Sequence, residues 1–276
     1  MVESIILGVA LSLATTLPLA WKWNLGMRRT TLAVACLGLL TGGLTGIVVS
    51  YLQLATSMHL EAVVNWILTL SAALALLLYR FFRDPERTVP VSPYVIVSPA
   101  DGEVLYVREA KNGILPVSTK RGCHFGLSEL TKAPLQLKDA AVIGIGMSFL
   151  DVHINRAPIA GRVLMKRHFP GLFGSLRRAS MVFQNERMTT IIQHDTVQVA
   201  VVQIASRLVR QIVSFVDEGQ RVQLGQRIGV IRFGSQVDLV VPLRTDLKVM
   251  VKPGDRVKAG ESIVAIHQSQ ADTVPV

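Results

Sequence analysis

The chain has 276 residues, half of them hydrophobic, and its two cysteines, Cys36 and Cys123, lie far apart. This usage excludes a disulfide framework and a cysteine-based zinc site, and it fits a reducing compartment. The formal net charge is +10, and most of it lies after residue 90, where 23 Lys and Arg face 15 Asp and Glu. Because no nucleic-acid-binding motif accompanies this charge, we expect an anionic membrane surface and no nucleic acid as partner; an ordinary solvated basic surface is the alternative.

Three uncharged, mostly apolar runs precede residue 80, at residues 4–20, 31–55 and 62–79. A helix rises ~1.5 Å per residue, so the first run reaches roughly 25 Å, just short of a bilayer core, whereas the second is long enough to span. A signal peptide is the alternative for the first run, but no basic region precedes it. We therefore predict a membrane anchor with two or three transmembrane helices at residues 1–82 and a second domain at 83–276.

The basic residues that flank these runs predict the orientation. They are Lys22, Arg28 and Arg29 in the first loop, and Arg80, Arg83 and Arg87 after the third run. The positive-inside rule places the first loop and the second domain in the cytoplasm, at the cell (inner) membrane. Three spans put the N-terminus outside; if the first run does not span, the other two form a hairpin and the domain is still cytoplasmic.

From residue 95 onward the pattern changes to short β runs separated by Gly and Pro turns. Nine segments are typical of strands: residues 95–97, 103–108, 141–149, 162–168, 188–193, 198–205, 228–233, 236–242 and 262–267. We therefore predict a β-rich domain large enough to form one core.

Two internal repeats indicate the architecture of this domain. PADGEV at 99–104 is similar to PIAGRV at 158–163, and EGQRVQLG at 218–225 is similar to PGDRVKAG at 253–260. Such turns, in which glycine supplies the positive φ, are typical of barrel-sandwich hybrid domains such as biotinyl and lipoyl domains. We expect a fold that resembles a barrel-sandwich hybrid.

The dipeptide Gly234-Ser235 separates the predicted strand at 228–233 from the one at 236–242. After it, Val237, Leu239 and Val241 alternate with more polar positions, which is typical of a half-buried strand. Glycine in a strand marks a kink or a close approach of the backbone. A strained backbone there would let the serine hydroxyl reach the Gly234 carbonyl, whereas a bulge with a polar residue at its crest is the plainer interpretation. These residues alone leave both open.

Four sequence blocks stand in order along the chain: FRDPER at 82–87, SPADG at 98–102, DVHINRAP at 151–158 and FGS at 233–235, with NER at 185–187 before the last. Together they resemble the phosphatidylserine decarboxylase family of pyruvoyl-dependent proenzymes, and most nearly its short form, which includes archaetidylserine decarboxylases. The resemblance covers roughly residues 80–270.

This resemblance implies that the bond between Gly234 and Ser235 breaks itself. Ser235 Oγ would attack the Gly234 carbonyl to form an ester, and β-elimination with loss of ammonia would leave a pyruvoyl group at position 235. The products, residues 1–234 and 235–276, would form a heterodimer. The domain at 83–276 would then be catalytic and would convert phosphatidylserine to phosphatidylethanolamine, with the pyruvoyl carbonyl as the electron sink.

The resemblance also implies catalytic roles for Asp101 and His153. An Asp–His pair can orient an imidazole as the base toward a hydroxyl. Longer members of the family carry two histidines three residues apart, and here the second of these positions is Arg156. We expect Arg156 to bind a phosphate or carboxylate of the substrate.

Two non-enzymatic functions are the alternatives: a membrane-anchored barrel-sandwich adaptor, and a phosphocarrier domain phosphorylated on His153. An adaptor would need a long helical hairpin between the sandwich halves, and the sequence has no such stretch. The remaining histidines have no metal-ligand spacing, so no metal is expected; in the β-rich domain they are His124, His168, His194 and His267.

Overall fold

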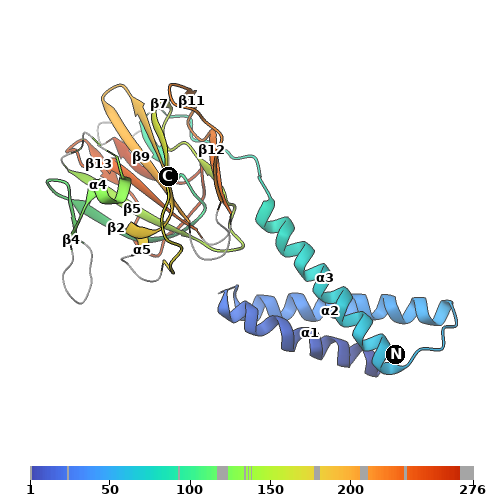
Figure 1. Cartoon of the computed structure of the whole chain (residues 1–276). Helices are drawn as coiled ribbons and strands as arrows, with labels where there is room; N and C mark the ends of the chain where they lie inside the picture. Colours follow the sequence, from blue (N-terminus) through green and yellow to red (C-terminus); the bar gives the residue numbers. More distant parts are fainter. Residues whose placement is uncertain are drawn as a thin grey trace. The chain divides into compact units, whose positions relative to one another are not determined.

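The computed structural model describes residues 2–23, 25–92, 94–116, 124–133, 135, 137, 139–176, 181–205, 211–232 and 235–267, without the side chains of His124, Phe125 and Ser235. The chain forms two compact units (Figure 1). One comprises Met1–Arg83 with Ser148–Leu150, and the other comprises Asp84–Met147 with Asp151–Val276. This division of the chain falls beside the boundary predicted between residues 82 and 83.

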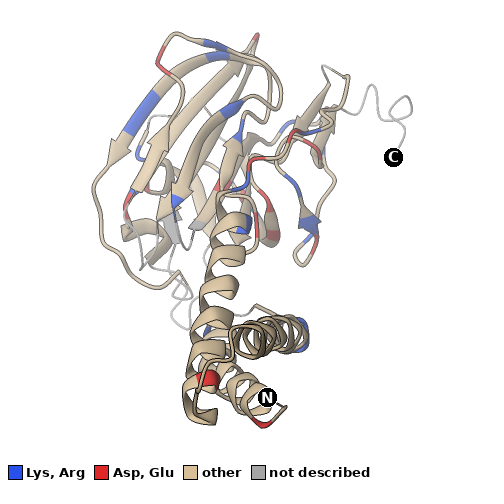
Figure 2. Ribbon diagram, turned by 90° about the vertical axis from the view of Figure 1, so that its right-hand side faces the viewer, with Lys and Arg blue, Asp and Glu red and all other residues tan. Residues whose placement is uncertain are grey.

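The first unit contains three helices, α1 (Val2–Lys22), α2 (Met27–Tyr51) and α3 (Met58–Phe82). All three are long and apolar enough to cross a membrane. Their ribbons carry few charged residues, whereas Lys, Arg, Asp and Glu are scattered over the β-rich unit (Figure 2). Membrane association of the chain is therefore supported by all three predicted apolar runs.

A buried polar side chain joins the three helices. Asn65 of α3 accepts hydrogen bonds at Oδ1 from the hydroxyls of Thr41 (2.7 Å) and Thr69 (3.2 Å). A Cβ placed on Gly8 of α1 or Gly42 of α2 would lie only 2.5 or 2.7 Å from Asn65 Nδ2. Glycine at these positions therefore lets the helices approach closely, as small residues do in membrane helix pairs.

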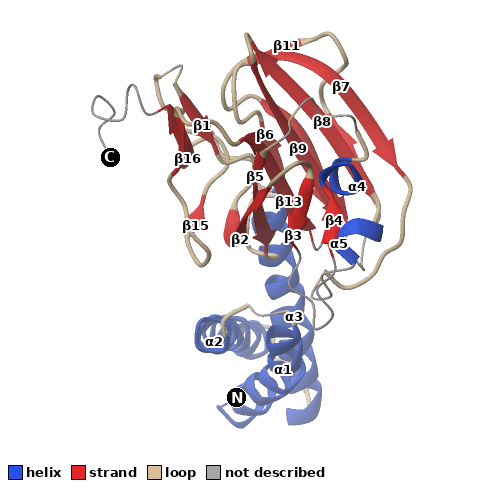
Figure 3. Cartoon of the chain, turned by 90° about the vertical axis from the view of Figure 1, so that its left-hand side faces the viewer, coloured by secondary structure: helices blue, strands red, loops and turns tan. Residues whose placement is uncertain are grey.

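The second unit is built on an eight-stranded antiparallel sheet with the order β11-β7-β8-β9-β13-β5-β2-β15. The strands are β2 (Gly102–Ala110), β5 (Ala140–Met147), β7 (Gly161–Phe169), β8 (Arg187–His194), β9 (Val197–Ala205), β11 (Arg221–Val222), β13 (Ser235–Pro242) and β15 (Arg256–Val257). The sheet curls into a half-barrel (Figure 3). The prediction of a β-rich domain after apolar helices is confirmed, and the barrel-sandwich hybrid stays a prediction.

Smaller elements cover the two faces of this sheet. They are the sheets β1 (Val95–Val97)-β16 (Ile263–His267)-β14 (Leu247–Val249), β10 (Gln211–Ser214)-β12 (Arg227–Arg232)-β6 (Ile154–Arg156) and β3 (Ile114–Pro116)-β4 (His124–Gly126), and the helices α4 (Leu127–Thr131) and α5 (Met181–Gln184). Each face therefore has its own apolar core: Val237, Leu239 and Val241 lie in one, and Val240 lies in the other.

The expectation that β13 is half-buried is wrong. Gln236 and Asp238, at its polar positions, are 2% and 0% exposed. The alternation of side chains is real, but α4, α5 and their loops cover the face that was expected to meet water. A strand in the middle of a sheet that is covered on both sides has no solvent face.

The two sequence repeats occupy equivalent places at opposite ends of the eight-stranded sheet. In one, Val257 of β15 pairs with Gly102 of β2; in the other, Val222 of β11 pairs with Gly161 of β7. Equivalent backbone bonds accompany them, from Val104 N to Asp255 O and from Val163 N to Gln220 O, both 2.9 Å. Similar sequences therefore make the same turn-to-strand contact twice.

Candidate active site

Ser235 is the first residue of the central strand β13. Its backbone is in register with Met147 at the end of β5 and with Ala205 at the end of β9. The predicted cleavage partner Gly234 and its neighbour Phe233 lie outside the described residues. The predicted cleavage point therefore falls where the connection from β12 enters the middle of the large sheet.

His153 lies beside the connection that leads to Ser235. Its carbonyl accepts the N–H of Ile231 at 3.2 Å, which extends the pairing of β6 with β12. Ile231 is four residues before Ser235, so the chain between them spans at most roughly 14 Å. The order of the strands thus brings the predicted histidine and the predicted cleavage point into one region.

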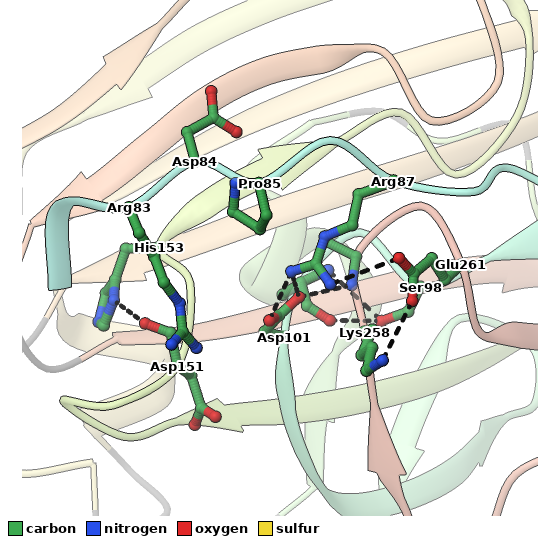
Figure 4. A network of polar contacts seen from close by, with 12 residues as sticks. Arg83, Asp84, Pro85, Arg87, Ser98, Asp101, Asp151, His153, Lys258 and Glu261 are labelled. Atoms are coloured by element: carbon green, nitrogen blue, oxygen red, sulfur yellow. Dashed lines mark hydrogen bonds and ion pairs between the residues drawn. The ribbon is translucent and has the colours of Figure 1, made fainter. Parts of the chain in front are cut away.

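The imidazole of His153 is held as a neutral base. The side chain is 2% exposed, and burial lowers its pKa from 6.5 to about 4. Its Nδ1 lies 2.9 Å from the carbonyl oxygen of Asp151 (Figure 4). A carbonyl only accepts, so Nδ1 carries the proton and Nε2 carries the lone pair. This is the tautomer that can take a proton from a hydroxyl.

Asp101 is bound by an arginine and not by the histidine. Arg87 Nη2 donates to both carboxylate oxygens, at 2.9 and 2.7 Å, and the amide of Ala259 donates to Oδ1 at 2.8 Å (Figure 4). Within the described part of the chain no hydrogen bond joins Asp101 to His153. The expected Asp–His pair is thus replaced by an Arg–Asp ion pair, and the Asp151 carbonyl orients the imidazole.

Arg156 is 5% exposed, and its described contacts are with protein groups. Its guanidinium donates to the carbonyls of Gly225 and Pro85, both at 3.0 Å, and to Asp84 at 3.4 Å. Burial lowers its pKa, although it stays charged. Arg156 therefore holds Asp84 and Pro85 beside Gly225 within the β-rich unit, and substrate binding by Arg156 stays a prediction.

Asn185 supports the same end of the large sheet. Its Nδ2 donates to the carbonyls of Ala205 (3.0 Å) and Gly174 (2.9 Å), and its Oδ1 accepts the N–H of Gly174. Ala205 is the β9 partner of Ser235. The sequence contained the NER block without indicating a role for it. In the structure, Asn185 of this block binds the end of β9 that pairs with Ser235.

A second polar network, missed in the sequence, lies on β13 itself. Asp238 accepts hydrogen bonds from the Tyr106 hydroxyl (2.8 and 2.9 Å) and from Gln236 Nε2 (2.7 Å). Burial raises the pKa of Asp238 from 3.8 to about 6, and burial likewise raises the pKa of Tyr106. The signal was weak because Asp238 stood at an alternate position expected to face solvent.

Residues 74–265 match the family model described as phosphatidylserine decarboxylase. This range contains all five sequence blocks and 70% of the chain.

The chain belongs to the phosphatidylserine decarboxylase family.

Named relatives support this membership over most of the chain. The phosphatidylserine decarboxylase proenzyme of Erythrobacter litoralis is 41% identical over 80% of this chain and 84% of its own length. That of Azorhizobium caulinodans is 39% identical over 72% of this chain and 78% of its own. A relative from Methanocaldococcus jannaschii, 36% identical over 72% of this chain and 94% of its own, has archaetidylserine in its name instead. The family resemblance read from the sequence blocks is confirmed.

Family membership makes the chain an enzyme, and it disfavours the adaptor and phosphocarrier alternatives. The word proenzyme in the relatives' names indicates processing of the precursor in those proteins. In this member of the phosphatidylserine decarboxylase family, processing is predicted at Ser235. The backbone of Ser235 pairs with Met147 on one side and with Ala205 on the other.

Proposed function

We propose that this chain is a membrane-bound phosphatidylserine decarboxylase that cleaves itself between Gly234 and Ser235. It converts phosphatidylserine to phosphatidylethanolamine with a pyruvoyl group derived from Ser235. The observation that carries the proposal is the position of Ser235 at the start of β13, four residues after Ile231, whose N–H is bound by the carbonyl of the buried His153. The family match supports the reaction.

Self-cleavage requires a base, a nucleophile and a peptide bond in one place. His153 Nε2 takes the proton of the Ser235 hydroxyl while Oγ bonds to the Gly234 carbonyl carbon. The Gly234–Ser235 C–N bond then breaks, and the nitrogen takes up the proton, which leaves an ester. Removal of the Cα proton of residue 235 next expels the Gly234 carboxylate. The enamine left on the smaller chain tautomerises to an imine, which water hydrolyses to ammonia and a ketone.

The surroundings of residue 235 fit a pyruvoyl group at the new chain end. Its backbone register with Met147 and Ala205 does not depend on the bond that is broken. The seven residues that follow are also paired with β5 or β9, so the two chains remain associated as a heterodimer. When present, the pyruvoyl carbonyl binds the substrate amine and accepts the electrons released with CO₂.

The chain's own residues then have distinct tasks. His153 exchanges protons at the reacting carbon, because its imidazole is neutral and its Nε2 can accept a proton and return it. Burial lowers the pKa of His153, and the Asp151 carbonyl, the Asp151 carboxylate and, last, the carboxylate of Asp101 oppose this effect. Asp101 is held in place by its ion pair with Arg87. Arg156 contributes positive charge toward the anionic substrate, in addition to holding Asp84 and Pro85.

The membrane part of the proposal rests on the three apolar helices and on the basic residues that flank them. We propose that the helices anchor the enzyme in the cell (inner) membrane with the catalytic unit in the cytoplasm. The substrate is then a lipid of the same bilayer. The barrel-sandwich description belongs to this proposal too, supported by the repeated turns at both ends of the large sheet.

A denaturing gel with intact-mass measurement tests the proposal. Wild-type protein should give two chains, and the smaller should begin with a pyruvoyl group at residue 235. Ser235→Ala should give one full-length chain that releases no CO₂ from carboxyl-labelled phosphatidylserine. Vesicles with the diacyl and the archaeal ether lipid, tested in parallel, distinguish the two substrates. A single uncleaved wild-type chain with no CO₂ release would refute the proposal.

A further inference from the structure

A buried pair of amide side chains connects the two sheets that meet near the cleavage point. Gln203 Nε2 donates to Asn155 Oδ1 at 2.8 Å, and the two residues are 1% and 0% exposed. Gln203 lies on β9 of the eight-stranded sheet, and Asn155 lies on β6 of the three-stranded sheet β10-β12-β6 (Figure 3). The bond therefore links two sheets that contribute apolar side chains to the same core.

Each amide lies two residues along the chain from a position at the proposed site. Asn155 is two residues after His153, and Gln203 is two residues before Ala205, the β9 partner of Ser235. Residues i and i+2 of a strand face the same side and lie roughly 7 Å apart. The pair thus joins β6, which begins directly after the histidine, to β9, which pairs with the start of β13.

Further contacts fix the amides in place. Asn155 Nδ2 lies 3.4 Å from the carbonyl of Pro99, two residues before Asp101. On the other side, Gly229 is the β12 partner of Asn155. A Cβ added there would lie 3.1 Å from Gln203 Nε2 and 2.6 Å from the carbonyl of Val213. The glycine leaves only enough room for the amide.

We propose that the Asn155–Gln203 pair is a positioning device for self-cleavage, which sets the distance and register between His153 and the start of β13. The inference rests on the proposed function. An apolar pair would fill the same volume, but a hydrogen bond between amides is directional, and each buried amide needs its partner. A base must lie within hydrogen-bond reach of its proton, and a misplacement of about 1 Å can cost ~10²-fold in rate.

The test follows self-cleavage of full-length precursors over time on denaturing gels, together with thermal unfolding. Gln203→Met removes the amide at nearly constant volume. Gln198→Met is the matched control, because Gln198 lies on the same strand and donates to Gln193 Oε1 at 2.9 Å, at the far end from Ser235. We expect Gln203→Met to slow cleavage by about 10- to 100-fold, and the control to cleave at the wild-type rate.

A double variant separates positioning from stability. Gln203→Met leaves Asn155 with an unsatisfied acceptor and lowers the melting temperature, whereas adding Asn155→Leu removes both partners and should restore it. Cleavage should stay slow in the double variant. Hydroxylamine cleaves an ester but not a peptide bond, and it should not rescue either variant, because the first step is the one slowed.

Three results would overturn the inference. They are a Gln203→Met rate equal to that of the control, a cleavage rate that recovers with melting temperature in the double variant, and full rescue by hydroxylamine. Failure of the proposed function itself looks different. In that case wild-type protein would not yield two chains, whatever residue stands at position 203.

Discussion

The pH dependence of self-cleavage depends on how deeply His153 is buried. Burial lowers the pKa of this imidazole from 6.5 to about 4, and Nδ1 is committed to the Asp151 carbonyl. Only the neutral imidazole can take the proton of Ser235. At pH 5.5, an imidazole with a pKa of 4 is about 97% neutral, whereas one with a pKa of 6.5 is about 9% neutral.

We therefore expect the cleavage rate at pH 5.5 to stay close to its value at pH 8 and to fall only as the pH approaches 4. The assay uses precursor made by cell-free synthesis in detergent, shifted to each pH and sampled on gels. Replacing the base by His153→Ala should slow cleavage at every pH by about 10²–10⁴-fold. A wild-type rate that halves near pH 6.5 would show that the imidazole is solvated, and it would refute the reasoning.

Stability has to be followed in the same samples. The folded pKa of His153 lies below its unfolded value, so its unfolded form binds more protons between pH 6.5 and 4. The associated stability is fully present above about pH 6.5 and is lost as the pH falls, by about 3 kcal/mol in all. Thermal unfolding at each pH distinguishes a protonated base from an unfolded precursor.

Four further outcomes are expected. Arg87→Gln leaves the buried Asp101 carboxylate without its cation and should lower the free energy of unfolding by about 3–5 kcal/mol in denaturant titrations; no change would show that the ion pair is dispensable. Tyr106→Phe removes a donor to Asp238 and should cost about 1–3 kcal/mol in the same assay, and an unchanged midpoint would contradict this. Gly42→Leu should separate the helices and lower the yield of folded protein extracted from the membrane. A yield equal to that of the wild type would refute the close packing. Protease outside sealed cells should spare the β-rich unit, and its digestion would reverse the orientation.

The membrane helices and most strands of the large sheet could be predicted from local pattern. Uninterrupted apolar runs about as long as a bilayer core is thick favour helices, because a helix satisfies its own backbone hydrogen bonds. Each of the nine predicted strand segments overlaps a strand of the structure, but the segment at 141–149 extends past the end of β5 at Met147. Ser148–Leu150 belong to the helical unit. Strands of two or three residues, such as β6 and β15, carry too few side chains for a period to be read.

The sequence by itself determined the family of this protein, its apolar helices and the residues from which a reactive site could be made. Only the tertiary structure decided their partners. Asp101 is bound by Arg87 instead of His153, and Gln203 meets Asn155 across 48 positions of sequence. Burial of Asp238 is equally invisible locally, because it depends on α4 and α5 closing over one face of the sheet. The physical reason is that pattern along a strand specifies which side a residue faces, whereas packing of distant segments determines what lies on that side.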